Sequence, residues 1–114
     1  MTARRQALGV KGEAMAAAWY EANGYEVVAR NWRCRDGEID LILRRGNTIV
    51  ICEVKTRSSA AFGTPAEAVT RTKQLRLRRL AAQWLHEHQV GGSILRFDVA
   101  AVLAGELEVI EAAF

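Results

Sequence analysis

The chain of 114 residues has only two cysteines and one proline, and it has no long uncharged hydrophobic run. Cys34 and Cys52 form no C-x-x-C pair and have no neighbouring histidine, so the sequence predicts neither a disulfide framework nor a zinc site. Free thiols are typical of a reducing cytoplasm, which is the location we expect. No stretch approaches the roughly 18 apolar residues of a membrane helix, and a secretory signal is not predicted either.

Charged residues are abundant but nearly balanced, with 16 basic and 13 acidic side chains and a net charge of +3. Five of the basic residues fall between Arg71 and Arg79 with no acid among them, which predicts a local basic face rather than a basic tail. Half of the residues are apolar, so a chain of this length can bury one core. We therefore expect a single domain over residues 1–114.

Hydrophobic periodicity and turn residues predict two helices and five strands in the order αβββαββ. The expected elements are a helix over residues 8–23, strands over 25–33, 38–45 and 48–57, a second helix from Thr64 or from a restart near Thr70 to about His88, and strands over 94–103 and 106–113. Three strands before the second helix favour an α/β fold with a mixed sheet and flanking helices over a regularly alternating βα fold.

The second and third strands are the most informative segment, because only a Gly-Asn pair separates them and they read as a hairpin. Side chains alternate along a strand, so Glu38, Asp40 and Ile42 are expected to share one face. Counting inward from a two-residue turn places Asp40 opposite Glu53, and Glu38 opposite Lys55. Two carboxylates are therefore predicted to meet across the hairpin.

Opposed carboxylates repel one another, and a divalent cation, Mg²⁺ or Mn²⁺, between Asp40 and Glu53 would remove that conflict. Lys55 shares the face of Glu53 and could orient a water molecule or offset charge in a transition state. The alternative is a solvated ladder of salt bridges on an exposed face. That alternative is weakened because Ile49 and Ile51 also share the face of Glu53, which indicates a strand that runs from the core into a polar pocket.

Three motifs occur in order along the chain: GEIDLI at 37–42, EVKTR at 53–57 and RFDV at 96–99. Together they resemble the YraN-like family of small bacterial endonuclease-like proteins. This family is similar to archaeal Holliday-junction resolvases within the PD-(D/E)xK nuclease superfamily. The resemblance covers nearly the whole chain, starting at Gly12-Glu13 in the first helix.

The resemblance implies a restriction-endonuclease-like fold in which Asp40 and Glu53 bind Mg²⁺ or Mn²⁺ and Lys55 assists hydrolysis. Glu13 resembles the helix-borne acid that completes such sites, although an exposed helix glutamate is the alternative. Ile39 stands where the superfamily motif has a proline. The implied substrate is nucleic acid, in the first place DNA and including branched DNA, and the likeness to dimeric resolvases implies a homodimer.

A second group of residues is predicted to contact nucleic acid. Lys73 falls on the sheet-facing stripe of the second helix, where a lysine needs an anionic partner or a phosphate, or else extends to the surface. Gln74 is adjacent to it and is a secondary candidate. Arg57 suits a phosphate, and equally a pairing with Glu38 or Asp98. The remaining arginines of this helix are expected to contact backbone phosphates: Arg71, Arg76, Arg78 and Arg79.

Two functions from different classes remain open at this point. One is a metal-dependent endonuclease, and the other is a non-catalytic nucleic-acid-binding module that retains the nuclease fold. The complete set of Asp40, Glu53 and Lys55 favours the enzyme, because a binding module has no evident need for opposed acids. A protein–protein adaptor in DNA processing is a third and weaker alternative.

Overall fold

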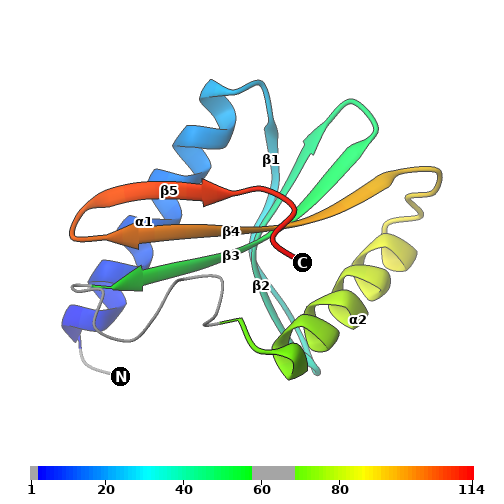
Figure 1. The fold of residues 1–114 in the computed structure, drawn as a ribbon. Helices are drawn as coiled ribbons and strands as arrows, with labels where there is room; N and C mark the ends of the chain where they lie inside the picture. The colour runs from blue at the N-terminus through cyan, green and yellow to red at the C-terminus, as the bar shows by residue number, and fades with distance from the viewer. Residues whose placement is uncertain (1–2, 58–68) are drawn as a thin grey trace.

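A computed structural model describes the backbone of residues 3–57 and 69–114, with side chains from residue 9 onward. The described part has the order of helices and strands that the sequence predicts (Figure 1). The elements are α1 (Ala3–Ala22), β1 (Glu26–Cys34), β2 (Gly37–Arg45), β3 (Thr48–Arg57), α2 (Arg71–Glu87), β4 (Ile94–Leu103) and β5 (Glu106–Ile110). Among these, no helix is both long and apolar enough to cross a membrane.

Most element bounds agree with the sequence analysis. The limits of β3 and β4 are the predicted ones, whereas α1 begins at Ala3 rather than at residue 8. The restart predicted near Thr70 is confirmed, because the Thr70 side chain caps α2 by accepting the Lys73 N–H at 3.2 Å. The alternative start at Thr64 lies outside the described residues.

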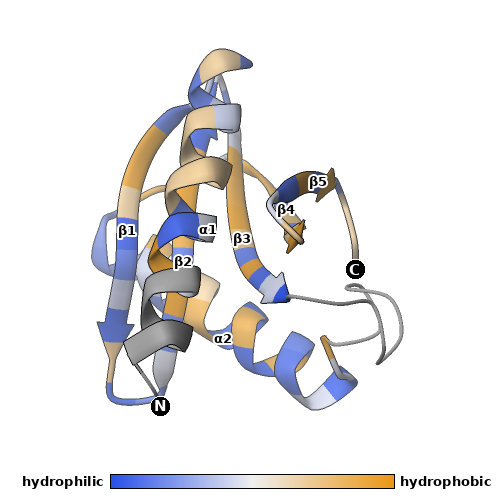
Figure 2. Cartoon of the chain, turned by 90° about the vertical axis from the view of Figure 1, so that its left-hand side faces the viewer, coloured by the Kyte–Doolittle hydropathy of each residue, from blue (hydrophilic) through white to orange (hydrophobic). Residues whose placement is uncertain are grey.

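The five strands form one mixed sheet in the order β1-β2-β3-β4-β5, in which only β3 and β4 pair in parallel. The α/β fold with a mixed sheet is therefore confirmed. Two core clusters lie on opposite faces of the sheet, one under α1 and the other under α2. Figure 2 shows that β3 is hydrophobic along most of its length and turns polar towards its C-terminal end. This polar end of β3 marks the region where the predicted site residues lie.

Gly12 allows α1 to lie directly against β3. It is buried, and a Cβ atom at this position would overlap Thr56 Oγ1 and would lie 3.5 Å from Val102 Cγ2. A larger residue would push the helix off the sheet or force Thr56 to move. The absence of a side chain at Gly12 therefore determines how close the next residue, Glu13, comes to the sheet.

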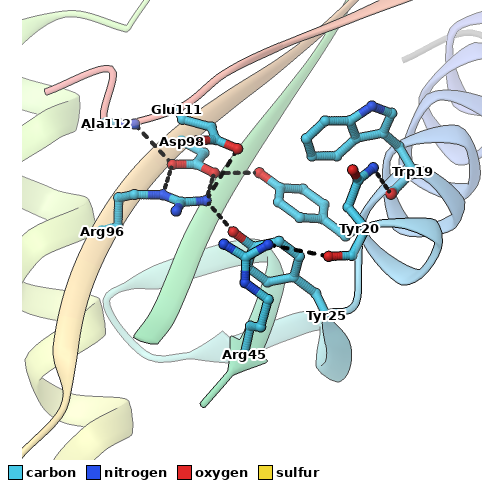
Figure 3. A network of polar contacts seen from close by, with 9 residues as sticks. Trp19, Tyr20, Tyr25, Arg45, Arg96, Asp98, Glu111 and Ala112 are labelled. Carbon is cyan, nitrogen blue, oxygen red and sulfur yellow. Dashed lines mark hydrogen bonds and ion pairs between the residues drawn. The ribbon is translucent and has the colours of Figure 1, made fainter. Parts of the chain in front are cut away.

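A buried polar network around Asp98 holds the C-terminal end of α1 against the sheet (Figure 3). The Asp98 carboxylate accepts hydrogen bonds from the Tyr20 hydroxyl at 2.6 Å, from Arg96 at 2.8 and 2.9 Å and from the Ala112 N–H at 3.0 Å. Burial raises the pKa of Tyr20, so its hydroxyl remains protonated and can donate. A buried carboxylate needs such partners, and here they join α1, β4 and the segment after β5.

We predict opposite effects for alanine at two glycines of α1. Gly9→Ala meets nothing within 4 Å and should stabilise the protein by about 0.5–1 kcal/mol, because glycine is a poor helix former. Gly12→Ala should destabilise it by about 1–3 kcal/mol, because the added methyl group meets Thr56. Urea denaturation measures both effects. Thr56→Ala in the Gly12→Ala background should restore part of the loss, and equal effects at the two glycines would contradict the packing described here.

Candidate active site

The pairing of β2 with β3 confirms the count made from the turn. Arg45 pairs with Thr48, and the same register continues to Leu41 and Cys52. The next positions are Asp40 and Glu53, and there the backbone pairing ends. Instead, the Val54 N–H donates a hydrogen bond of 2.8 Å to Asp40 Oδ2. Glu38 and Lys55, expected to be opposite each other, lie beyond the end of the paired segment.

One part of the predicted alternation is wrong. Ile39 and Ile42 pack in the same core cluster under α2, although strict alternation puts them on opposite faces. The β1–β2 pairing shows the reason, because Asn31 and Asp40, which lie between two regular pairs, are not themselves paired. Asn31 has a φ of +49°, a left-handed conformation that asparagine tolerates better than most residues. The alternation of side chains is therefore interrupted at this point in both strands. We call this interruption the step, and Asp40 lies at it.

Glu53 is held by two lysines. Its Oε1 atom lies 2.7 Å from Lys73 Nζ and 3.7 Å from Lys55 Nζ, and its side chain is only 9% exposed. The anionic partner predicted for Lys73 is thus present within the protein. Burial is the largest single influence on the pKa of Lys73 and lowers it, but the hydrogen bond to Glu53, the contact with Lys55 and the charges of Glu53 and Asp40 together outweigh burial, so the net shift is upward. Burial and the neighbouring Lys73 lower the pKa of Lys55.

Three further carboxylate groups gather beside this ion pair. One oxygen each of Glu13, Glu38 and Asp40 lie within 4.8 Å of one another, and Glu38 also accepts a 3.1 Å hydrogen bond from Arg33. Burial and the charge of Glu53 raise the pKa of Asp40 to about 7. Burial likewise raises the pKa of Glu13. Carboxylates are therefore crowded here, and burial together with their mutual repulsion holds the pKa values of Asp40 and Glu13 above their ordinary range.

Two pockets lie side by side along α2 and share Arg76 as a wall. The first has a volume of about 260 Å³ and is lined by residues of β2, β3 and α2, namely Glu38, Asp40, Glu53, Lys73, Arg76 and Leu77. The second has about 340 Å³ and is lined by Asp36, Arg76, Arg79, Leu80 and Gln83. The predicted acids Asp40 and Glu53 thus face one cavity. Arg76 and Arg79 of α2 line the neighbouring one.

The other basic candidates have different surroundings. Arg71 is exposed at the start of α2, and Arg57 ends β3. Gln74 donates to the Val69 carbonyl at 3.1 Å and so stabilises the start of α2. Arg78 lies over the rings of Phe97 and Phe114, at 4.7 and 5.7 Å from their centroids. Its stacking on these rings was not predicted, and it separates Arg78 from the arginines that line the pockets.

Two residues of the site were missed or underrated from the sequence. Glu38 was expected as a partner of Lys55 or Arg57 and not as a member of the acidic group, although its two-residue spacing from Asp40 was the available signal. Asn31 was not considered, although a hydrogen bond from its side chain to Glu13 partly offsets the rise in the pKa of that carboxyl. An asparagine inside a strand, where this residue type is depleted, was the signal for an irregularity there.

We predict that the raised pKa of Asp40 makes metal-free stability fall as the pH rises. The folded state binds this proton more tightly than the unfolded chain, whose value is about 3.9, so stability declines between about pH 4 and about pH 7. Wild type should lose about 2 kcal/mol of unfolding free energy between about pH 5 and about pH 8. Asp40→Asn keeps an acceptor for the Val54 N–H, and its unfolding free energy should fall less over the same pH range. Urea denaturation in EDTA measures the difference.

The control for this experiment is Asp36→Asn, which removes an exposed carboxylate on the same side of the molecule. It should retain the pH dependence of wild type. Added Mn²⁺ should stabilise wild type and Asp36→Asn but should do little for Asp40→Asn. An Asp40→Asn protein that is clearly less stable at the higher pH in EDTA would show that the charge of Asp40 is satisfied rather than strained.

Comparison with known proteins agrees with the resemblance noted in the three motifs. Residues 12–102 match the family described as "Uncharacterised protein family UPF0102". A UPF0102 protein of Beutenbergia cavernae is 61% identical over 99 residues, which cover 87% of this chain and 84% of that protein. One of Nocardia farcinica is 56% identical over 99 residues, covering 87% and 78%, and one of Parafrankia is 55% identical over 97 residues, covering 85% and 82%. The chain therefore belongs to the UPF0102 family, which is the YraN-like family.

Proposed function

We propose that this protein is a cytoplasmic metal-dependent endonuclease that hydrolyses phosphodiester bonds of nucleic acid, in the first place DNA. The observation that carries the proposal is the convergence of Asp40, Glu53 and Lys73 on one pocket at the step in β2, with Lys55 beside Glu53. Burial and like charge raise the pKa of Asp40 to about 7, which is the strain that a bound cation would relieve.

The residues present fit a hard divalent cation. Carboxylate oxygens are the ligands that Mg²⁺ and Mn²⁺ prefer, and the crowded charge at Asp40 needs a counter-ion. Asp40 and Glu53 would hold the ion, and Glu13 would complete the set of carboxylates around it. Bound there, the ion would supply Lewis-acid chemistry and a reactive water for hydrolysis.

The lysines of the site have separate tasks in this proposal. Lys55 has a lowered pKa, so it gives up its proton more readily than an ordinary lysine and can exchange a proton with water near the scissile phosphate. Lys73 keeps its proton and presents positive charge at the pocket wall. Charge of this kind stabilises the developing negative charge of a phosphoryl transition state.

The basic face of α2 supplies the path for the nucleic acid. Arg76 borders both pockets and Arg79 borders the second, so a backbone that has one phosphate in the acidic pocket can place a neighbouring phosphate against the arginines. The homodimer implied by the likeness to resolvases stays a prediction.

A non-catalytic binding module is the second candidate. The observation in its favour is that Glu53 already has two lysine partners, so its charge is satisfied without a metal ion. The crowding of Asp40 argues for the enzyme, because a module that only binds phosphate gains nothing from a strained acid beside it.

We predict Mg²⁺- or Mn²⁺-dependent cleavage in a screen of single-stranded, duplex, flap and four-way-junction DNA. Glu53→Gln and Asp40→Asn should each reduce the rate by roughly 10²-fold or more, as expected when a group acts in the transition state. Glu21→Gln, an exposed acid on α1, is the control and should cleave like wild type. Binding to DNA without cleavage by any of these proteins would favour the non-catalytic module.

We also predict that DNA binding weakens steeply with salt, because arginines that meet phosphates release counterions. Arg76→Ala and Arg79→Ala should each reduce the slope of log affinity against log salt by about 0.9. Arg78→Ala is the matched control on the same helix, since Arg78 lies over Phe97 and Phe114. Fluorescence anisotropy at several salt concentrations measures the slopes. Unchanged slopes for Arg76→Ala and Arg79→Ala would place the binding face elsewhere, and an equal reduction for Arg78→Ala would show that the face includes Arg78.

A further inference from the structure

We propose that Lys73 is a built-in counter-ion of Glu53 that a divalent cation has to displace, so that Lys73 lowers the affinity of the site for metal. This inference rests on the proposed function, because it concerns the same carboxylate. It adds a regulating role for a residue of α2 that is not itself a ligand.

The contact between Lys73 and Glu53 is the tightest ion pair described in the site. Lys73 Nζ lies 2.7 Å from Glu53 Oε1, a distance typical of a strong charge-assisted hydrogen bond. Lys55 Nζ approaches the same oxygen at 3.7 Å. One oxygen of a nearly buried carboxylate is therefore shared by two ammonium groups, and this is the oxygen that faces the pocket wall formed by α2.

The start of α2 holds Lys73 in this place. The Thr70 side chain accepts the Lys73 N–H, and Gln74 donates to the Val69 carbonyl, so the backbone of this first turn of α2 is anchored. The side chain itself is 32% exposed and has a flexible stem. The ammonium can therefore leave Glu53 while the helix stays in position.

Competition follows from these positions. A divalent cation at Glu53 would meet an ammonium group within a few ångströms, and the two positive charges would repel each other strongly in a partly buried pocket. Either Lys73 moves away or the ion binds weakly. Once displaced, the ammonium still borders the pocket and can turn to a phosphate there, so metal and nucleic acid should each favour the binding of the other.

The decisive experiment measures Mn²⁺ binding by isothermal titration calorimetry, without nucleic acid. Lys73→Met and Lys73→Gln should bind Mn²⁺ at least tenfold more tightly than wild type. Lys11→Met, which removes an exposed lysine of α1, is the matched control and should bind within twofold of wild type. In EDTA the two Lys73 variants should melt at a lower temperature than wild type, and Mn²⁺ should raise their melting temperature more. Circular dichroism verifies folding, and Lys73→Gln, which keeps a donor, serves if Lys73→Met does not fold.

The outcomes separate this inference from the proposed function. Equal or weaker Mn²⁺ binding by the Lys73 variants, with binding by wild type intact, would overturn the role of Lys73 and leave the metal site standing. Binding by the variants alone would support the inference in its strongest form. A failure of wild type and both variants to bind Mn²⁺ would overturn the inference and the proposed function together. Glu53→Gln combined with Lys73→Met should abolish the gain, because the carboxylate for which the two cations compete is then gone.

Discussion

The hydrogen bond from the Val54 N–H to the Asp40 carboxylate lies where the backbone pairing of β2 and β3 ends. A backbone N–H needs a partner where its strand loses a neighbouring strand, and here a side chain takes the place of the missing carbonyl. This allows the two strands to stop pairing while β3 continues beside β4 as far as Arg57. The pocket, the exposure of its carboxylates and the approach of α2 to them all depend on this replacement of a backbone carbonyl by the Asp40 carboxylate.

Charge balance then determines the character of the pocket. Glu53 obtains two lysines, whereas Asp40 obtains one N–H and the repulsion of neighbouring acids. The two carboxylates were equivalent in the hairpin pattern, but their surroundings make one satisfied and the other strained. Such a difference between adjacent acids is common where a protein needs a cation or a proton at a defined place.

The scaffold that presents this pocket uses polar groups in a different way. Asp98 is fully buried, yet its carboxylate has four donors from three parts of the chain, so it stabilises the packing of α1 instead of facing a cavity. Gly12, in the middle of α1, sets the distance between α1 and β3. The two contacts together hold the middle and the C-terminal end of α1 against the sheet, and Glu13 is placed at the site as a result.

The sequence by itself determined the order of the elements, the limits of β3 and β4, and the hairpin register as far as Leu41 and Cys52. These follow from turn chemistry and periodicity, which act over a few neighbouring residues. Only the tertiary structure decided that the strands step at Asn31 and Asp40, that Glu53 pairs with lysines, and that Arg78 stacks on aromatic rings while Arg76 lines the pockets. The ion pairs and the stacking depend on how α2 packs across the sheet, and contacts between residues so far apart in the chain leave no local pattern. At the step, Asn31 marks an irregularity in the sequence but does not show which way the neighbouring side chains turn.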